Sequence, residues 1–408
     1  MLRSAPLETE KIDRHVESQL RMLLDRDVVL PGEFFTDERV FALERERLFT
    51  RSWLCVGLSS DVPQHGHAHP VEILNVSLLM VRDGGTVRVF HNVCSHRGAR
   101  LVNEPCGGRV RIVCPYHGWT YGLDGSLLKT PHVAGAKVHQ HEDWDPRTLG
   151  LVPVRCAEWA GHVFIDLSGN AEPFERWIAP VAARLALPED ADWAHDPHLG
   201  QRLEVAANWK IIGENFVESY HLPWVHRQLN TVNPMEQHYQ ILGGHHYLGQ
   251  GGSAYAGERL YGPELPTFRD GVDRRHYEAL YIFPNLILAP LPDVIFSIII
   301  EPVAAGCSKE RIAFFFAGTD ALAEPLRATR QRSAQFLIDV NLEDVHIVES
   351  VQRGRTSPAF RGGRFSLPQE ATSLQLQKMV AATLLAERNQ RAADVVPLPI
   401  LDIPHPVG

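Results

Sequence analysis

Short apolar runs separated by turn signals dominate the first half of this chain. Their residues are largely β-branched, and turn sequences such as Asp83-Gly84-Gly85 and Asp124-Gly125 lie between or after them. The runs at 71–81, 86–91 and 109–113 therefore predict strands of a small β domain.

Elsewhere the pattern predicts both strands and helices. Residues 280–288, 294–302 and 311–316 form apolar runs of strand length. The sequence Thr36-Asp37-Glu38 provides a capping residue and first-turn acids for a helix that runs towards Phe49. The first half of segment 208–226 also predicts a helix, which Pro223 interrupts.

Composition and charge narrow the class of protein. The chain has 408 residues, of which 44% are apolar and 22% charged, as in ordinary globular proteins. Its 49 acidic and 40 basic residues argue against a dedicated nucleic-acid-binding protein. The best candidate for a membrane span, residues 294–306, is interrupted by Glu301 and Pro302. Because the N-terminus lacks the apolar core of a signal peptide, we expect no membrane association and a cytoplasmic protein.

Four potential metal ligands form two closely spaced pairs. Cys94-x-His96 is followed, after seventeen residues, by Cys114-x-x-His117. Two cysteines and two histidines suit either a structural zinc ion or a Rieske [2Fe–2S] cluster. Zinc fingers keep their cysteines together, whereas each pair here mixes one cysteine and one histidine. The pattern therefore favours the Rieske cluster over zinc.

The sequences CSHRGARL and CPYHGWTY resemble the Rieske motifs of bacterial ring-hydroxylating oxygenase alpha subunits. Respiratory Rieske proteins carry an extra cysteine in each loop, where this chain has Ala99 and Tyr116. The resemblance implies that Cys94, His96, Cys114 and His117 hold a [2Fe–2S] cluster.

A second group of candidate ligands lies about 100 residues downstream. In the segment that begins at Asn208, spacing predicts Glu214 and Glu218 on one helix face, with Glu218 and His221 also neighbours. His221 and His226 with one carboxylate would form the two-histidine, one-carboxylate triad of non-heme Fe(II) enzymes. The pattern N-W-K-x3-E-N-x2-E-x-Y-H-x4-H is similar to the whole iron-site segment of the same oxygenase family.

The resemblance also implies the third ligand and an electron relay. It places the remaining acid in a late helix that matches residues 342–354, where Asp344 corresponds to the ligand. The nearby alternatives are Glu343, Asp339 and His346. Glu218 corresponds to the residue that bridges the Rieske histidine of one subunit and the iron histidine of its neighbour.

Glu218 bears on the substrate as well. Most ring hydroxylases have Asp at this position, whereas Glu resembles the branch that oxidises quaternary ammonium compounds such as carnitine, glycine betaine and stachydrine. The alternative is that Glu replaces Asp without any meaning for the substrate. Aromatic side chains that could line the pocket, by cation–π contact or around a flat ring, are Tyr277, Tyr281, Phe283, Phe296, Trp224 and Tyr255.

Taken together, the resemblance implies an α+β protein with three parts. Residues 1–40 are expected as a helical arm, 41–170 as an all-β Rieske domain, and 171–408 as a catalytic domain in which helices cover a curved antiparallel sheet. The expected activity is that of a terminal oxygenase, a monooxygenase or dioxygenase, which uses O2 and a small substrate at a mononuclear Fe(II). We also expect a homotrimer. An aromatic-ring dioxygenase and an electron-transfer Rieske protein are the competing functions.

Electrons are expected from NAD(P)H through a separate reductase of flavin or ferredoxin type. Only Gly249-Gln250-Gly251-Gly252-Ser253-Ala254 fits a loose dinucleotide fingerprint. That fingerprint must open a helix, but Gly257, Gly262 and Pro263 follow it. We therefore interpret these residues as turn glycines.

Overall fold

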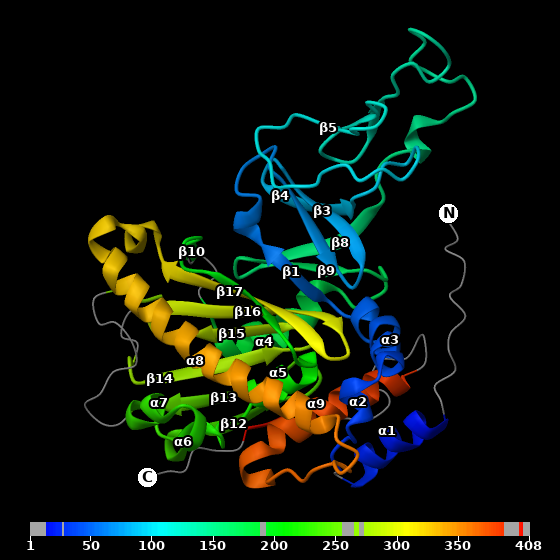
Figure 1. Cartoon of the computed structure of the whole chain (residues 1–408). Coiled ribbons are helices and arrows are strands. Elements are labelled where there is room, and N and C mark those ends of the chain that lie inside the picture. Colours follow the sequence, from blue (N-terminus) through cyan, green and yellow to red (C-terminus); the bar gives the residue numbers. More distant parts are fainter. Residues whose placement is uncertain are drawn as a thin grey trace. The chain divides into compact units, whose positions relative to one another are not determined.

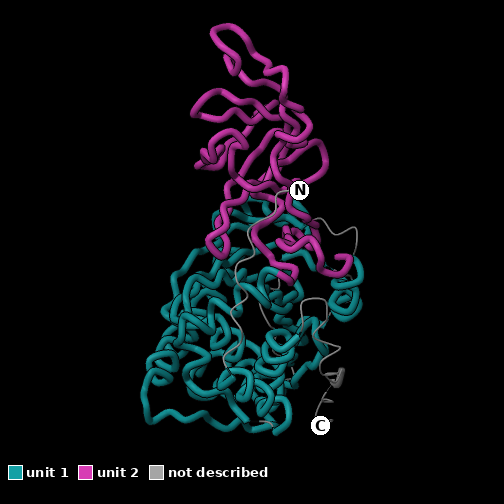
Figure 2. Tube along the Cα trace, turned by 90° about the vertical axis from the view of Figure 1, so that its right-hand side faces the viewer, with its two compact units in different colours: residues 1–50, 175–408 teal, residues 51–174 magenta. Residues whose placement is uncertain are grey.

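The computed structural model describes residues 14–26, 28–187, 193–254, 265–268 and 273–386, and the backbone of residues 400–402. The chain divides into two compact units, one of residues 51–174 and one that joins the segment up to residue 50 with residues from 175 onward (Figure 2). The segment expected as a separate N-terminal arm therefore contributes to the larger unit, where its helices α1 and α3 pack against α9.

Helices occur almost entirely in the larger unit. Their bounds are α1 Arg14–Arg26, α2 Glu33–Thr36, α3 Glu38–Arg47, α4 Phe174–Leu185, α5 Trp209–Phe216, α6 Leu222–Val225, α7 Arg227–Val232, α8 Arg327–Arg355 and α9 Leu367–Leu385. The helix predicted from Thr36 begins at Glu38, because Asp37 is its N-cap and accepts a hydrogen bond from the Arg39 N–H.

The smaller unit is built from antiparallel strands. Six of them form one sheet in the order β1-β9-β8-β4-β3-β2, and three short ones form the sheet β5-β6-β7. Their bounds are β1 Leu54–Leu58, β2 Ala68–Ile73, β3 Val76–Asp83, β4 Thr86–His91, β5 Ile112–Val113, β6 Thr120–Tyr121, β7 Leu127–Lys129, β8 Pro153–Trp159 and β9 His162–Asp166.

The run at 71–81 forms two strands of a hairpin rather than one strand. Leu74 and Asn75 adopt positive φ values of 53° and 64° and make the two-residue turn between β2 and β3. Two such residues are typical of the hairpin turn whose twist matches its strands, but that turn usually has glycine as well. Without a glycine, the apolar pattern conceals this turn.

The larger unit contains a nine-stranded antiparallel sheet, which α8 crosses on one face (Figure 1). Its order is β10-β17-β16-β15-β14-β13-β12-β18, and β11 also pairs with β17. The bounds are β10 Trp193–His195, β11 Gln201–Val205, β12 Tyr239–Gly243, β13 Tyr247–Ser253, β14 His276–Ile282, β15 Leu286–Pro290, β16 Val294–Ala304, β17 Cys307–Ala317 and β18 Ile400–Asp402. An all-β unit and a helix-covered antiparallel sheet confirm the predicted α+β class.

One strand prediction in this sheet is also a hairpin. Residues 280–288 contain the end of β14, a turn at 283–285 and the start of β15, paired with Leu280 opposite Leu288. Pro284 lies in the turn, where its missing N–H costs no ladder hydrogen bond. The neighbouring predictions at 294–302 and 311–316 are confirmed by β16 and β17, which are both longer than predicted.

Among the described residues, no helix has the length and apolar character needed to span a membrane.

Candidate metal centres

Two loops of the smaller unit share one backbone design. In each loop, a cysteine N–H donates to the carbonyl five residues later, and the cysteine carbonyl accepts from a glycine N–H four residues later. These bonds join Cys94 to Ala99 (2.8 Å) and Gly98 (2.9 Å), and Cys114 to Trp119 (2.8 Å) and Gly118 (3.1 Å). Both glycines have positive φ, +74° and +70°, which strains residues that carry a side chain. The two cysteines therefore sit in equivalent positions of their loops, whereas His96 follows its cysteine by two residues and His117 by three.

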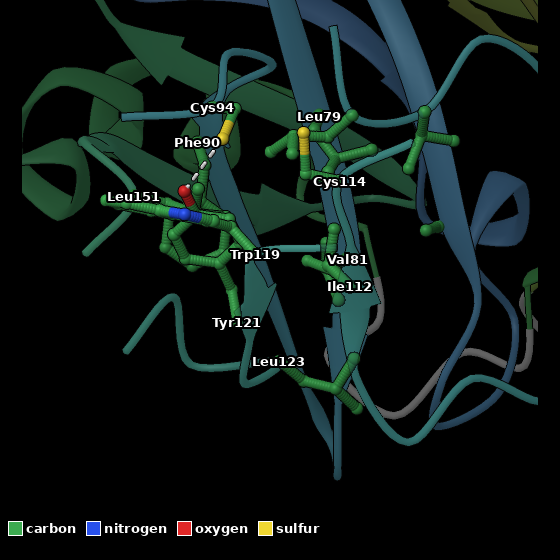
Figure 3. Packing of buried hydrophobic residues seen from close by; sticks show 13 residues of the cluster. Leu79, Val81, Phe90, Cys94, Ile112, Cys114, Trp119, Tyr121, Leu123 and Leu151 are labelled. Atoms are coloured by element: carbon green, nitrogen blue, oxygen red, sulfur yellow. Dashed lines mark hydrogen bonds between the residues drawn. The ribbon is translucent and has the colours of Figure 1, made fainter. Parts of the chain in front are cut away.

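The two cysteines belong to the packed core of the unit. Figure 3 shows both sulfur atoms at one edge of this core, with Trp119 and Tyr121 beside them. The Tyr121 hydroxyl lies 3.1 Å from the Cys94 sulfur and also accepts the Ser95 N–H. Burial raises the pKa of the Cys94 thiol. A metal that binds this sulfur must therefore displace a firmly held proton.

The two histidines face outward from the same loops. His117 is exposed and His96 half-buried, and their ring centroids are 4.7 Å apart. His96 also stacks on Trp119 at 4.7 Å, with the planes only 7° apart. Burial lowers the pKa of His96, assisted by His117 and Arg97, which favours the neutral form that a metal ligand must have. Two buried sulfurs and two outward-facing imidazoles suit a [2Fe–2S] cluster. In such a cluster the cysteines bind one iron and the histidines bind the other.

The spacing of these four side chains argues against a single zinc ion. Bond lengths of 2.0–2.3 Å would bring all zinc ligand atoms within about 4.6 Å of one another. In the described part of the chain, only His221, His226 and Asp344 bring three or more ligand atoms within 4.8 Å of one another. As placed in this structure, the four residues of the two loops do not form the compact group that a single zinc ion requires.

Helix α5 directly precedes the second group of predicted ligands. It is held by contacts with α3, with α9 and with the Ala305 carbonyl. Its N-cap Asn208 accepts the Lys210 N–H at 3.0 Å and donates to the Ala305 carbonyl at 2.7 Å. The Lys210 ammonium is fully buried and lies 2.5 Å from the Glu44 carboxylate of α3. At Gly213, a Cβ would lie 2.9 Å from Leu376 of α9, so glycine permits the close approach of the two helices.

Helix α5 confirms the helix predicted in the first half of segment 208–226, but it ends before Glu218. It stops at Phe216, where side chains from distant elements satisfy the last carbonyls. Thr372 donates to the Val217 carbonyl, Ser373 to that of Glu214, and Gln250 to that of Phe216. The chain then bends, and Pro223 lies in the first turn of α6, where proline is tolerated.

Because of this bend, Glu214 and Glu218 do not share a helix face as predicted. Glu214 instead pairs with Arg355 at 2.7 Å and accepts from Gln377 at 2.8 Å. Glu218 lies in the bend, and its carboxylate accepts the backbone N–H groups of Tyr220 and His221.

His221, His226 and Asp344 converge as predicted. The Asp344 Oδ1 atom lies 2.9 Å from His226 Nε2 and 3.5 Å from His221 Nε2, and the imidazole centroids are 5.0 Å apart. Asp344 shares the inward face of α8 with Leu337, Asn341 and Val348, which are buried at helical spacing. Two imidazoles and one carboxylate on one side of a pocket suit Fe(II) with positions left open for other ligands.

Each of the two histidines also contacts a carboxylate through its other nitrogen. Nδ1 of His221 lies 2.5 Å from Glu218, and Nδ1 of His226 lies 2.7 Å from Glu343. Burial opposes protonation of His226, but Asp344 and Glu343 outweigh it and raise the pKa of that imidazole. Glu343, an alternative third ligand in the sequence, thus lies behind His226.

The other two alternatives lie away from the triad. The exposed Asp339 accepts a hydrogen bond from Gln335, and His346 is exposed on α8.

A pocket opens in front of the triad. The described residues that line it are mostly apolar, with aromatic rings from Phe216, Tyr277 and Phe296 and polar groups from Asn215, His238, Gln250 and Asn341. Tyr277 and Phe296 were expected there from the sequence, whereas Phe216 was not.

The remaining aromatic candidates lie elsewhere. Tyr281 is fully buried and donates its hydroxyl to the Pro284 carbonyl, Phe283 packs near Trp209, and Trp224 is 62% exposed. Tyr255 lies outside the described residues.

Buried hydrogen bonds orient the polar wall of the pocket. Gln250 donates to the Phe216 carbonyl, so its amide oxygen faces His238 Nδ1 at 3.1 Å. Asn341 donates to Glu310 at 2.8 Å, and burial raises the pKa of that carboxyl group to about 7. Gln250 lies in β13, Glu310 lies in β17, and His238 directly precedes β12; local sequence patterns do not connect these positions to the site.

The glycine-rich segment from Gly249 lies in a strand and not in the predicted turn. Residues 249–253 belong to β13 and pair with β14. A Cβ at Gly249 would lie 2.2 Å from the Ala279 carbonyl oxygen of β14. Its glycines therefore allow close approach within the sheet.

Comparisons with known families match both units. Residues 52–141 match the Rieske [2Fe-2S] domain, and residues 187–386 match the ring hydroxylating alpha subunit (catalytic domain). The first match contains the two cysteine–histidine loops, and the second contains His221, His226 and Asp344.

Several curated proteins are similar to this chain. The carnitine monooxygenase oxygenase subunit of Escherichia coli (strain K12) is 30% identical over 82% of this chain and 86% of its own. The chloroplastic choline monooxygenase of Spinacia oleracea is 31% identical over 83% and 74%, respectively. The glycine betaine monooxygenase oxygenase subunit of Chromohalobacter salexigens is 38% identical over a shorter stretch, 50% of this chain and 44% of its own.

Solved structures are similar as well. The quaternary ammonium Rieske monooxygenase CntA in complex with L-carnitine has a TM-score of 0.72 and 25% identity, covering 89% of this chain and 98% of its own. Naphthalene 1,2-dioxygenase from Rhodococcus sp. has a TM-score of 0.73 at 20% identity, covering 93% of this chain and all of its own, which shows a shared fold.

Proposed function

This chain belongs to the Rieske non-heme iron oxygenases, and on that premise we propose that it N-demethylates or hydroxylates a small quaternary ammonium compound. Its relatives include oxygenase subunits of carnitine, choline and glycine betaine monooxygenases.

The two ligand sets are proposed to bind different metal centres. We assign Cys94, His96, Cys114 and His117 to the [2Fe–2S] cluster, and His221, His226 and Asp344 to the mononuclear iron. When bound, these metals supply electron transfer and the reductive activation of O2. Electrons would come from NAD(P)H through a separate reductase.

Glu218 is proposed to connect the two centres across subunits. Its carboxylate orients His221 through Nδ1 at 2.5 Å, and neighbouring N–H groups hold it in place. A carboxylate so placed can accept a proton from a second imidazole supplied by a neighbour. A solved structure of a quaternary ammonium Rieske monooxygenase gives insights into inter-subunit electron transfer in that enzyme. We therefore propose a homotrimer for this chain.

The kinds of side chain in the pocket wall favour a quaternary ammonium compound as the substrate. Phe216, Tyr277 and Phe296 offer aromatic rings, and no lysine or arginine is among the described residues that line it. Aromatic faces attract a quaternary trimethylammonium group, whose nitrogen bears four carbon atoms and has no N–H to donate.

The proposed reaction balances with two electrons from the reductase. One N-methyl C–H bond becomes C–OH while O2, two electrons and two protons also yield one water. The N-hydroxymethyl ammonium product then breaks its C–N bond, releasing formaldehyde, a proton and the tertiary amine. The pocket side chains hold the methyl group towards the triad and exclude water from it.

The test is steady-state oxygen consumption with a surrogate reductase and NADH. A panel of carnitine, choline, glycine betaine and simple aromatic acids would be compared, with formaldehyde assayed alongside. Uptake with an ammonium compound, with formaldehyde from N-demethylation or a stable hydroxylated product, supports the proposal. Uptake only with the aromatic acids, and no formaldehyde, would replace it with ring hydroxylation.

A further inference from the structure

We propose that Glu343 is a second positioning carboxylate of the iron site, which orients His226 as Glu218 orients His221. Its Oε2 atom lies 2.7 Å from His226 Nδ1. The neighbouring Asp344 approaches the opposite nitrogen, Nε2, at 2.9 Å. Two consecutive acids of α8 therefore hold one imidazole from both of its nitrogens. The inference rests on the proposed iron ligands and not on the proposed substrate.

The geometry separates the roles of the two acids. His221 and His226 both direct Nε2 towards Asp344, so a metal between these three groups lies on the Nε2 side of each ring. Glu343 touches the Nδ1 side of His226 and cannot reach that metal through the ring. A carboxylate that accepts the Nδ1 proton leaves the Nε2 lone pair free and makes it a stronger donor.

The two positioning carboxylates differ in their surroundings. Glu218 is buried, with 11% of its side chain exposed, whereas 48% of the Glu343 side chain is exposed. The His226 side chain is only 2% exposed, so this contact joins a surface carboxylate to a buried imidazole. Glu343 thus contacts the buried His226 from the protein surface. Substitution of Glu343 should therefore leave the surrounding helices and strands in place.

The experiment measures metal binding directly. Protein with an oxidised cluster and an empty mononuclear site would be titrated with Co(II) by calorimetry, and the bound Co(II) examined by EPR, since the oxidised cluster is EPR-silent. We expect Glu343→Ala to weaken Co(II) binding by about 10- to 100-fold and to change its EPR spectrum. Glu343→Gln should lie between this variant and the parent, because its amide oxygen can still accept the Nδ1 proton.

Asp339→Ala and Asp339→Asn are the matched controls. Asp339 is an exposed acid on the same helix, bonded to Gln335. Both controls should bind Co(II) as the parent does, and the Rieske absorption of every variant should be unchanged. Parent-like affinity and EPR of Glu343→Ala would overturn the inference. Complete loss of Co(II) binding in a folded Glu343→Ala protein would do so too, because it would make Glu343 a ligand.

Discussion

Glu218 is the residue on which the proposed link between the two metal centres depends. With Fe(II) in excess, so that any weaker binding by His221 is compensated, we expect Glu218→Ala to retain both metals and to lose turnover by about 100-fold or more, because a positioned proton-accepting group contributes on that order. Iron analysis, the Rieske spectrum and substrate-dependent oxygen uptake together check this. Failure to bind the mononuclear iron even with Fe(II) in excess, or normal turnover, would contradict the bridging role.

Asp293 gives a prediction about pH that does not involve the metals. It is fully buried, and burial raises the pKa of its carboxyl group to about 7 despite the nearby Arg274. The folded state thus holds the proton more tightly than the unfolded state, so the contribution of Asp293 to stability falls as pH rises from about 4 to 7. Asp293→Asn should be more stable than the parent at pH 8, by about 1–3 kcal/mol.

Melting temperatures of parent and Asp293→Asn at pH 5 and pH 8 test this. The advantage of the variant should be larger at pH 8. Asp320→Asn, which removes the same charge from an exposed position, should show little pH-dependent difference. An equal effect of Asp293→Asn at both pH values would show that Asp293 has no raised pKa.

Individual residues also show which parts of the two sites could be predicted from the sequence. The spacing of Cys94, His96, Cys114 and His117 predicts a shared site, because both pairs are local. Asp344 needed family resemblance, since 118 residues separate it from His226 and local geometry cannot bridge them. The contact of Glu343 with His226 was not predicted, because adjacent acids on a helix look equivalent until the inward face is known.

Among the secondary-structure elements, α5 depends on a buried ion pair. Lys210 and Glu44 are fully buried, and burial lowers the pKa of the ammonium group. Lys210→Met would leave the Glu44 carboxylate without its cation and should cost about 3–5 kcal/mol. The double variant Lys210→Met/Glu44→Gln should recover a large part of this loss.

Urea unfolding midpoints would measure the coupling. Arg21→Met breaks the exposed pair with Glu17 on α1 and should cost less than about 1 kcal/mol. If Lys210→Met were as mild as Arg21→Met, the buried pair would not hold α5 in place. If the double variant were no better than Lys210→Met, the cost would not come from the unpaired carboxylate.

Element boundaries were harder to predict than element types. The β-rich runs were recognised, but the turn at Leu74-Asn75 has neither glycine nor proline to mark it, and the turn signal of Pro284-Asn285 was missed inside an apolar run. The end of α5 could not be predicted either, because Thr372, Ser373 and Gln250 satisfy its carbonyls from far along the chain. Long-range contacts of this kind determine where Glu218 and His221 lie.

At the scale of the whole molecule, the proposed trimer predicts that defective subunits can complement each other. Cys114→Ala should lack the cluster, and Asp344→Ala should lack the mononuclear iron, so each alone should be inactive. In randomly mixed trimers, about a quarter of the head-to-tail contacts pair an intact cluster with an intact iron site. Coexpression should therefore restore up to that share of activity.

The matched control is a double variant, Cys114→Ala/Asp344→Ala, mixed with one of the single variants. Those mixtures contain no contact between an intact cluster and an intact iron site, and they should stay inactive. If trimers of the two single variants form and also remain inactive, electron transfer within one subunit would replace the proposed transfer between subunits.

The central claim is that this chain couples its two metal centres to the oxidation of a bound quaternary ammonium compound. The most direct test is a single turnover of protein with a reduced cluster, mixed with O2 with and without a compound identified by the panel. We predict rapid reoxidation of the Rieske absorbance only when the compound is present, with formaldehyde or a hydroxylated compound formed in step. Reoxidation at the same rate without the compound, or without any oxidised product, would contradict the account.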